Sequence, residues 1–110
     1  MKSFLITLWL SVAGMLLQGL AAEPTPAERK EFVETKAKAE QGNAFAQYNL
    51  GLMYEYGSGV VKDEVEAYKW YLLSGAQGNA NAKKGIEIIE RVLTPSPRAE
   101  GQKLARETKL

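Results

Sequence analysis

The sequence predicts an all-helical protein, a short solenoid of antiparallel helix pairs preceded by a signal peptide. The first observation is a repeated block, because QGNAFA at residues 41–46 returns as QGNANA at residues 77–82, 36 residues later. The second is that glycine and proline divide the chain after its apolar start into segments of helical length. The third is that no segment shows the sustained period-two alternation of a strand.

Residues 1–22 have the pattern of a secretory signal peptide. Met1 and Lys2 give a positive start, a stretch of seventeen residues without a charge follows, and small residues end it. Cleavage after Ala21 would place Gly19 and Ala21 at the two small-residue positions, so this bond is the expected one. The alternative is an uncleaved anchor, although the polar and glycine residues within the stretch make it a poor permanent span.

Residues 23–42 are predicted to form an N-terminal helix, the second half of an incomplete repeat. Thr25 is the expected N-cap, Pro26 suits the first helical position, and Glu28 can reach back to the cap. Gly42 supplies the left-handed conformation that ends many helices.

Residues 43–78 are predicted to be one complete repeat of two helices. Asn43 has the side chain of an N-cap and opens the first of them. This helix is expected to continue to Tyr56, because Gly57 can take the left-handed conformation that stops it.

The second helix of the repeat is predicted to follow a loop at residues 58–62. Asp63–Glu66 resembles a second capping box, in which the two end residues each bond the other's backbone. Trp70 and Tyr71 are expected to pack between the two helices of the repeat. Gly78 then ends the helix.

Residues 79–110 are predicted to be a degenerate terminal repeat with a capping helix. Asn79 caps a helix over residues 80–92. The segment Thr94–Pro97 is expected to break the chain before a last polar helix that runs towards Lys109.

Each Gln-Gly-Asn-Ala block is expected to be a tight corner between two helices. Glycine takes the positive φ angle that ends one helix, asparagine caps the next, and the alanines let the two helices approach closely. Two such corners with a period of 36 residues are typical of a stacked helical solenoid.

The complete repeat also carries a family resemblance. The spacing of its small, apolar and aromatic residues resembles that of the Sel-one-like repeat (SLR), a relative of the tetratricopeptide repeat with a slightly longer loop. The resemblance implies a right-handed α-solenoid that holds proteins together as an adaptor or scaffold and has no chemistry of its own. The matching positions are Ala44, Ala46, Leu50, Gly51, Met53, Tyr54, Gly57, Gly59, Val60, Asp63, Ala67, Trp70 and Tyr71, together with Gln77, Gly78, Asn79, Ala80 and Ala82 of the second block.

The terminal copy departs from this pattern. Where the complete repeat has LGLMY at residues 50–54, the later copy has IEIIE at residues 86–90, so that Glu87 stands in place of Gly51. The glycine lets a neighbouring helix approach and the glutamate does not, so the later copy is expected to end the stack.

The helix after Asn43 is apolar on two sides. One side, at helical spacing, is the expected packing face. The other is the candidate partner-binding surface, because the first helices of solenoid repeats line the concave face where peptides dock; core packing is the competing interpretation. The packing side consists of Ala46, Leu50, Met53 and Tyr54, and the candidate binding side consists of Phe45, Tyr48, Leu52 and Tyr56.

Composition excludes most catalytic chemistry. The chain has no histidine and no cysteine, so it lacks the usual ligands of zinc, haem and iron–sulfur clusters and the groups of thiol or serine–histidine catalysis. We therefore expect no metal, no cofactor and no enzymatic activity. Its 14 basic and 13 acidic residues give no electrostatic footprint for nucleic acid.

Two other functions stay open. One is a cell-envelope hydrolase or wall-modifying enzyme that uses Glu55 and Glu90 or Asp63, although Asp63 and Glu66 are better explained as helix caps. The other is an inhibitor or immunity-type protein that blocks a partner enzyme.

The favoured interpretation is an exported bacterial interaction module in the periplasm. It binds a protein or peptide partner and meets the membrane only through its leader. Solenoids generally need about three stacked repeats for stability, and this chain has fewer. We therefore expect a marginally stable fold to which partner binding or self-association adds stability.

Overall fold

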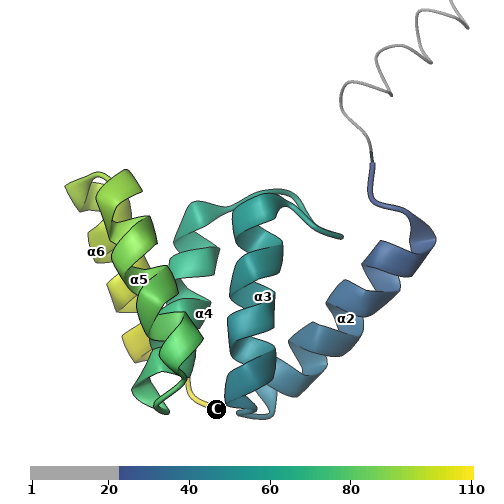
Figure 1. Cartoon of the computed structure of the whole chain (residues 1–110), viewed down its shortest axis with the longest axis horizontal. Coiled ribbons are helices and arrows are strands. Elements are labelled where there is room, and N and C mark those ends of the chain that lie inside the picture. Colours follow the sequence, from purple (N-terminus) through teal and green to yellow (C-terminus); the bar gives the residue numbers. More distant parts are fainter. Residues whose placement is uncertain (1–22) are drawn as a thin grey trace, which may run out of the picture.

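The computed structural model describes residues 23–110, and these residues form five helices and no strand (Figure 1). The all-helical prediction is confirmed over this range. The predicted signal peptide lies outside the described residues, and within them no helix has the length and apolar character that a membrane span requires. The helices are α2 (Pro26–Glu40), α3 (Ala44–Tyr56), α4 (Glu64–Ala76), α5 (Ala80–Val92) and α6 (Pro95–Glu107).

The first repeated block forms the corner between α2 and α3. Gly42 has a φ angle of 91°, which side chains other than glycine rarely adopt. Its N–H donates to the carbonyl of Ala39 at 3.0 Å, and the N–H of Asn43 donates to that of Lys38 at 3.2 Å. This pair of bonds is a Schellman motif. The side-chain oxygen of Asn43 then accepts from the N–H of Ala46 at 2.8 Å and starts α3.

The second block forms an equivalent corner between α4 and α5. Gly78 has a φ angle of 95°, and its N–H donates to the carbonyl of Gly75 at 2.9 Å. The side-chain oxygen of Asn79 accepts from the N–H of Ala82 at 2.9 Å. The interpretation of the repeated block as a pair of equal helix corners is therefore confirmed.

The start of α4 differs from the predicted capping box. One carboxylate oxygen of Asp63 accepts from the N–H groups of Val65 and Glu66, both at 3.1 Å. The reciprocal bond, in which the Glu66 carboxylate would accept from the Asp63 N–H, is not formed. That N–H donates to the Tyr54 carbonyl at 2.9 Å, and the Glu66 carboxylate lies 3.2 Å from the Lys69 ammonium. The side chain of Asp63 therefore caps α4 alone.

The break predicted at Thr94–Pro97 is present but shorter than predicted, because α5 ends at Val92 and α6 already begins at Pro95. Thr94 is the N-cap residue of α6, and Pro95 and Pro97 lie inside the first turn of the helix. The first N–H groups of a helix have no carbonyl partner within it, so a proline there removes no hydrogen bond. The prolines therefore lie in the first turn of the last helix and not in the break that precedes it.

The helices stack around α4 (Figure 1). Helix α3 packs on α2 and α4, and α4 also packs on α5 and α6. Two buried clusters result, and α4 contributes to both, with Trp70 and Tyr71 buried as predicted. The first cluster contains Ala67, Tyr68, Tyr71, Ile89 and Leu93, and the second contains Ala39, Ala46, Leu50 and Trp70.

Buried side-chain hydrogen bonds join the two corners. The Gln47 amide nitrogen donates to the Ala39 carbonyl at 3.1 Å, and its amide oxygen accepts from the Gln77 amide at 2.8 Å. The Ser74 hydroxyl donates to the Ala44 carbonyl at 2.6 Å. Gln47 and Ser74 are almost fully buried, so these bonds satisfy groups that water does not reach.

The ring of Tyr71 fits between α3 and α5 because each of these helices has a glycine at the contact. A Cβ atom on Gly51 would lie 2.5 Å from two ring carbons of Tyr71, and one on Gly85 would lie 3.3 Å from the ring. Gly51 therefore allows the close helix approach that the sequence predicted. Its counterpart in the later copy, Glu87, is exposed.

Substitution of Gly51 by alanine should destabilise the fold. The added methyl group overlaps the Tyr71 ring, and overpacking of this kind costs about 1–3 kcal/mol, offset by the roughly 0.5–1 kcal/mol that alanine gains over glycine in a helix. We expect a net loss of about 1–2 kcal/mol in the free energy of unfolding, measured by urea denaturation. Gly85→Ala is the matched control, because its methyl group would meet the same ring at 3.3 Å and needs only a small shift. Equal losses in the two variants would contradict the argument.

Candidate partner-binding surface

The candidate binding side of α3 divides into exposed and half-buried residues. Phe45 and Tyr56 are 66% and 72% exposed. Tyr48 and Leu52 are partly buried against the first core cluster, and the Tyr48 ring lies 5.9 Å from that of Tyr71. The binding interpretation and the core-packing interpretation therefore each have a basis in the structure. The middle of this side packs inward, and its two ends face solvent.

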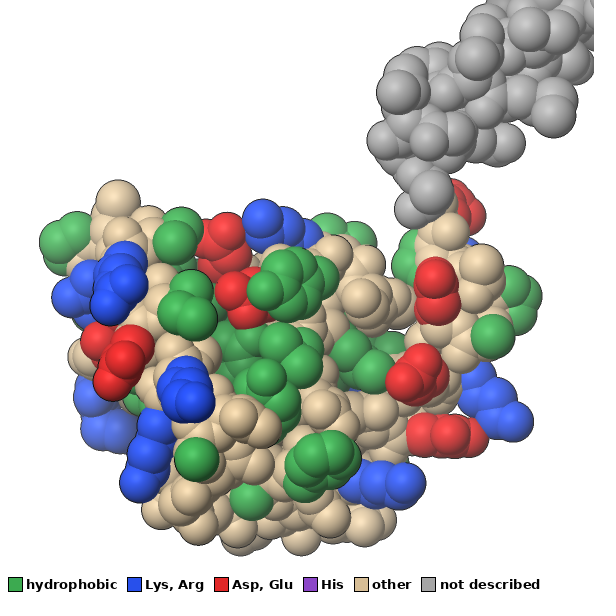
Figure 2. Space-filling view, viewed as in Figure 1, with side chains coloured by type: hydrophobic (Ala, Val, Ile, Leu, Met, Phe, Trp, Pro, Cys, Tyr) green, Lys and Arg blue, Asp and Glu red, His purple; other side chains and the backbone are tan. Residues whose placement is uncertain are grey.

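Helix α5 presents a corresponding row that the sequence analysis missed. Adding the 36-residue period to the four α3 positions gives Asn81, Lys84, Ile88 and Val92. Ile88 and Val92 are 55% and 62% exposed. The 36-residue period could have predicted these α5 positions from the α3 positions. Figure 2 shows apolar side chains gathered at the centre of the face that α3 and α5 present.

A shallow groove of about 170 Å³ runs between the two rows, and we call it the α3–α5 groove. Its walls come from α3 and α5, and the Tyr71 ring of α4 lies at its floor. The Tyr71 hydroxyl donates a hydrogen bond to the Glu55 carboxylate. The lining residues are Tyr48, Leu52, Glu55, Tyr56, Tyr71, Asn81, Lys84, Gly85 and Ile88.

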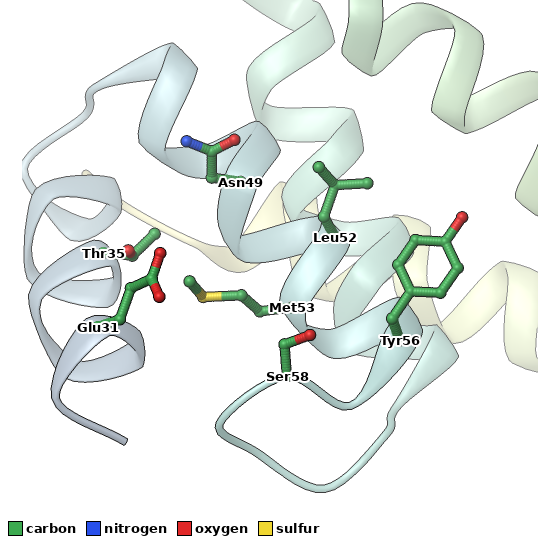
Figure 3. A pocket seen from close by; sticks show the side chains of 7 residues that line it. All are labelled: Glu31, Thr35, Asn49, Leu52, Met53, Tyr56 and Ser58. Carbon is green, nitrogen blue, oxygen red and sulfur yellow. The ribbon is translucent and has the colours of Figure 1, made fainter. Parts of the chain in front are cut away.

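A second groove of about 400 Å³ lies on the other side of α3 (Figure 3), and we call it the α2–α3 groove. Leu52 and Tyr56 line both grooves, so α3 forms a ridge between them. This groove could not be predicted from the sequence, because it depends on how α2 is angled against α3. The lining residues are Glu31, Thr35, Asn49, Leu52, Met53, Tyr56 and Ser58.

Burial raises the pKa of two core tyrosines. For Tyr71, burial is the larger cause, and the bond to the Glu55 carboxylate acts in the same direction. Burial likewise raises the pKa of Tyr68. Its hydroxyl donates to Glu90 at 2.7 Å and accepts from the Gln102 amide at 3.0 Å. Both hydroxyls therefore serve as neutral donors to carboxylates.

Each of the three carboxylates of the hydrolase alternative is engaged by a different partner in the structure. Glu55 accepts from Tyr71, Glu90 accepts from Tyr68, and Asp63 caps α4. Each of the two grooves is lined by a single carboxylate, Glu55 in one and Glu31 in the other. Glycoside hydrolysis generally needs two carboxyl groups flanking one bond. No group of side chains able to hold a metal ion occurs within residues 23–110.

The predicted repeat positions lie at the contacts between helices and in the turns. Tyr54 is half-buried and meets the Phe32 ring edge-on at 5.5 Å. Gly59 has a φ angle of 74°, and a Cβ there would lie 2.4 Å from the Glu28 carbonyl oxygen. The loop after α3 is therefore held against α2. Ala46, Leu50, Gly51, Ala67 and Trp70 are buried, Gly57 and Gly78 have positive φ angles, and Asp63 is the cap of α4.

Comparison with known proteins identifies the repeat. The family model described as Sel1 repeat matches residues 44–79. Chitin synthase regulatory factor 3 of Schizosaccharomyces pombe is 45% identical over 47 residues, which are 43% of this chain and 5% of that protein. The resemblance to the Sel-one-like repeat is therefore confirmed.

A solved structure matches the arrangement of helices. It is that of a protective antigen present in uropathogenic Escherichia coli strains, which displays an SLR fold. The TM-score is 0.72 at 29% sequence identity, and the match covers 74% of this chain and 18% of the other. The solenoid architecture is thereby confirmed, while this chain spans a small part of either relative's length.

Removal of the Tyr71 hydroxyl should change how stability depends on pH. Because burial raises the pKa of Tyr71, the unfolded chain loses this proton more readily, and the stability contribution is complete below pH about 10 and falls as pH rises further. Tyr71→Phe should cost about 1–2 kcal/mol at pH 7 through the lost bond to a carboxylate. The difference from the wild type should narrow above pH 10 in urea denaturation. A constant difference from pH 7 to 11 would contradict this role.

Proposed function

This chain is a Sel1-like repeat protein, and from this premise we propose that it is an exported, non-enzymatic adaptor that binds a segment of another protein across α3 and α5. Sel1 repeats and SLR folds are generally protein-interaction modules and not enzymes. In helical solenoids the first helices of the repeats line the concave face, and here these helices are α3 and α5.

The observation that carries the proposal is a row of exposed apolar side chains at equivalent repeat positions. Tyr56 and Val92 are related by the 36-residue period, and both face solvent. Phe45 and Ile88 add two further exposed side chains to the same two rows. Apolar surface of this kind costs roughly 25 cal/mol per Å² while it faces water. Contiguous patches on soluble proteins commonly mark binding sites.

The rigid support beneath this face favours binding of a partner in a defined pose. The Tyr71 ring and its bond to Glu55 lie under the α3–α5 groove, and the Gln47–Gln77 bond joins α3 to the end of α4. A surface whose side chains are already fixed loses less conformational entropy on binding. The presence of a single carboxylate in each groove likewise favours an adaptor over the hydrolase alternative.

Export is part of the proposal and rests on the leader. Residues 1–22 combine a positive start, an uncharged apolar stretch and small residues, which is the composition that secretion signals share. We infer delivery to the periplasm, because the leader and the resemblance both suit an exported bacterial protein.

Expression of the full chain in a Gram-negative bacterium should release a shortened protein from the periplasm. Intact-mass spectrometry of an osmotic-shock fraction should show loss of residues 1–21, since the expected bond follows Ala21. A variant lacking residues 3–20 is the control and should stay in the cytoplasm. Recovery of the unshortened chain in the membrane fraction would favour the uncleaved anchor.

A photo-crosslinking amino acid placed on the proposed face should capture the partner in cells. Replacement of Phe45 or Ile88 by benzoylphenylalanine should give a discrete crosslinked band, because both side chains face solvent beside the groove. Val61 is 85% exposed in the loop after α3 and lines neither groove, so it is the matched control position. Crosslinks from Val61 that equal those from Phe45 and Ile88 would show that the partner does not select this face.

Substitutions on the same face should weaken capture without unfolding the protein. The double variant Phe45→Ser and Ile88→Ser removes exposed apolar contacts, each of which contributes on the order of 1 kcal/mol at an interface. Recovery of the crosslinked partner through position 56 should fall about tenfold, with an unchanged circular dichroism spectrum. Undiminished recovery would exclude these rows as the main contact.

A further inference from the structure

The polar side chains of the α2–α3 groove are all able to accept hydrogen bonds. Glu31 and Thr35 come from α2, Asn49 comes from α3, and Ser58 comes from the loop that follows it. Carboxylate, hydroxyl and amide oxygens are acceptors. No lysine or arginine is among the lining residues. The groove therefore offers acceptors and one negative charge, without a cation of its own among the residues that line it.

Glu31 is the carboxylate of α2 that has no partner within the described part of the chain. Glu28 accepts from the Thr25 N–H at 2.9 Å in the capping box. Glu34 lies 4.0 Å from the Lys30 ammonium, and Glu40 lies 3.9 Å from that of Lys36. No ion pair or side-chain hydrogen bond engages Glu31 among residues 23–110. Its charge is therefore available to a ligand.

The groove also has an apolar wall opposite this carboxylate. Figure 3 shows the Glu31 carboxylate and the Met53 side chain pointing toward one another across the groove, with Ser58 below them. A methionine side chain adapts its shape to the groups that pack against it. Lysine and arginine combine an apolar stem with a cationic head, so they match both the thioether and the carboxylate.

The α3–α5 groove, on the other side of the α3 ridge, is lined by one residue of each charge, Lys84 and Glu55. The Glu55 carboxylate accepts a hydrogen bond from Tyr71, whereas Lys84 makes no ion pair within residues 23–110. Figure 2 shows acidic side chains along α2 where it faces α3 and basic side chains over α5. A cationic side chain of a partner is therefore attracted to the α2–α3 groove and repelled from Lys84, and this difference orients the partner.

We propose that the α2–α3 groove binds a lysine or arginine side chain of the partner segment, with Glu31 as its counter-ion and Met53 against its stem. The neighbouring apolar residues of the segment then cross the ridge at Leu52 and Tyr56 into the α3–α5 groove. This inference rests on the proposed function and adds the chemistry that the partner must have.

Selection from a random displayed peptide library tests the inference directly. The immobilised full-length chain should enrich peptides that contain lysine or arginine next to apolar residues. Glu31→Gln should lose the enrichment of basic residues, and Glu31→Lys should instead enrich aspartate and glutamate. Glu34→Gln is the matched control, since it removes one carboxylate from the same helix at a position outside the groove. It should select the same peptides as the wild type.

The possible failures of this selection are distinguishable. Peptides that lose binding to a Phe45→Ser and Ile88→Ser variant, but show no excess of basic residues, would overturn the groove assignment and leave the proposed function standing. Enrichment of basic residues by the Glu31→Gln variant would likewise overturn the groove assignment and leave the proposed function standing. A library that yields no peptide dependent on Phe45 and Ile88 would overturn both.

Affinity measurements on a selected peptide give the size of the effect. By fluorescence anisotropy, Glu31→Gln should weaken binding about 2- to 5-fold, the range of an ion pair that stays in contact with water. Replacement of the peptide's basic residue by glutamine should weaken binding to the wild type equally and leave binding to Glu31→Gln unchanged. Added salt should weaken the wild-type complex more than the variant complex. If the Glu31→Gln substitution and the glutamine replacement in the peptide each weaken binding by the same factor whether or not the other is present, the proposed contact would be overturned.

Discussion

The ring of Tyr71, held between Gly51 and Gly85, is the contact on which the rest of the structure depends. The ring comes from α4 and meets α3 along one edge and α5 along the other, so its width sets how far apart these two helices stand. Its hydroxyl is bonded to Glu55, and the ring itself is the floor of the α3–α5 groove. A single buried side chain thus determines the spacing of the solenoid and the depth of its proposed binding face.

The two corners complement this contact by fixing the ends of the helices. Gln47 accepts from Gln77, and Ser74 donates to the Ala44 carbonyl, so each corner is bonded to the next across the stack. A packed ring alone would allow α3 and α5 to slide along their axes, whereas directional bonds between buried groups define one register. The equal geometry of the corners therefore also explains why exposed positions of α3 recur on α5 at the repeat period.

Local signals in the sequence predicted the helices well, and contacts between helices were harder to predict. Gly42 and Gly78 could be interpreted alone, because a positive φ angle is a property of one residue. The Glu66 bond and the role of Pro95 depended on which of two local arrangements the surroundings favour. The Glu66 bond is not formed, and the predicted break before the last helix is shorter because Pro95 already begins α6. The grooves could not be predicted, because their walls come from different helices. Glu31 and Met53 face one another across the α2–α3 groove only because of the angle between α2 and α3, and no short-range sequence pattern predicts that angle.

The size of the face limits the kind of binding that it can support. A helix of 13 residues, as α3 and α5 both are, is about 20 Å long and, with its side chains, about 10 Å wide. The two helices therefore present roughly 400 Å² on one side, about half of the 800 Å² that each partner contributes to a standard interface. Apolar contact over this area gives weak, rapidly reversible association. Selectivity on so small a surface must come from a few directional or charged contacts, and Glu31 is a charge at its edge without a partner among the described residues. Additional repeats enlarge such a face, whereas the chemistry of the grooves decides which side chains a single repeat can distinguish.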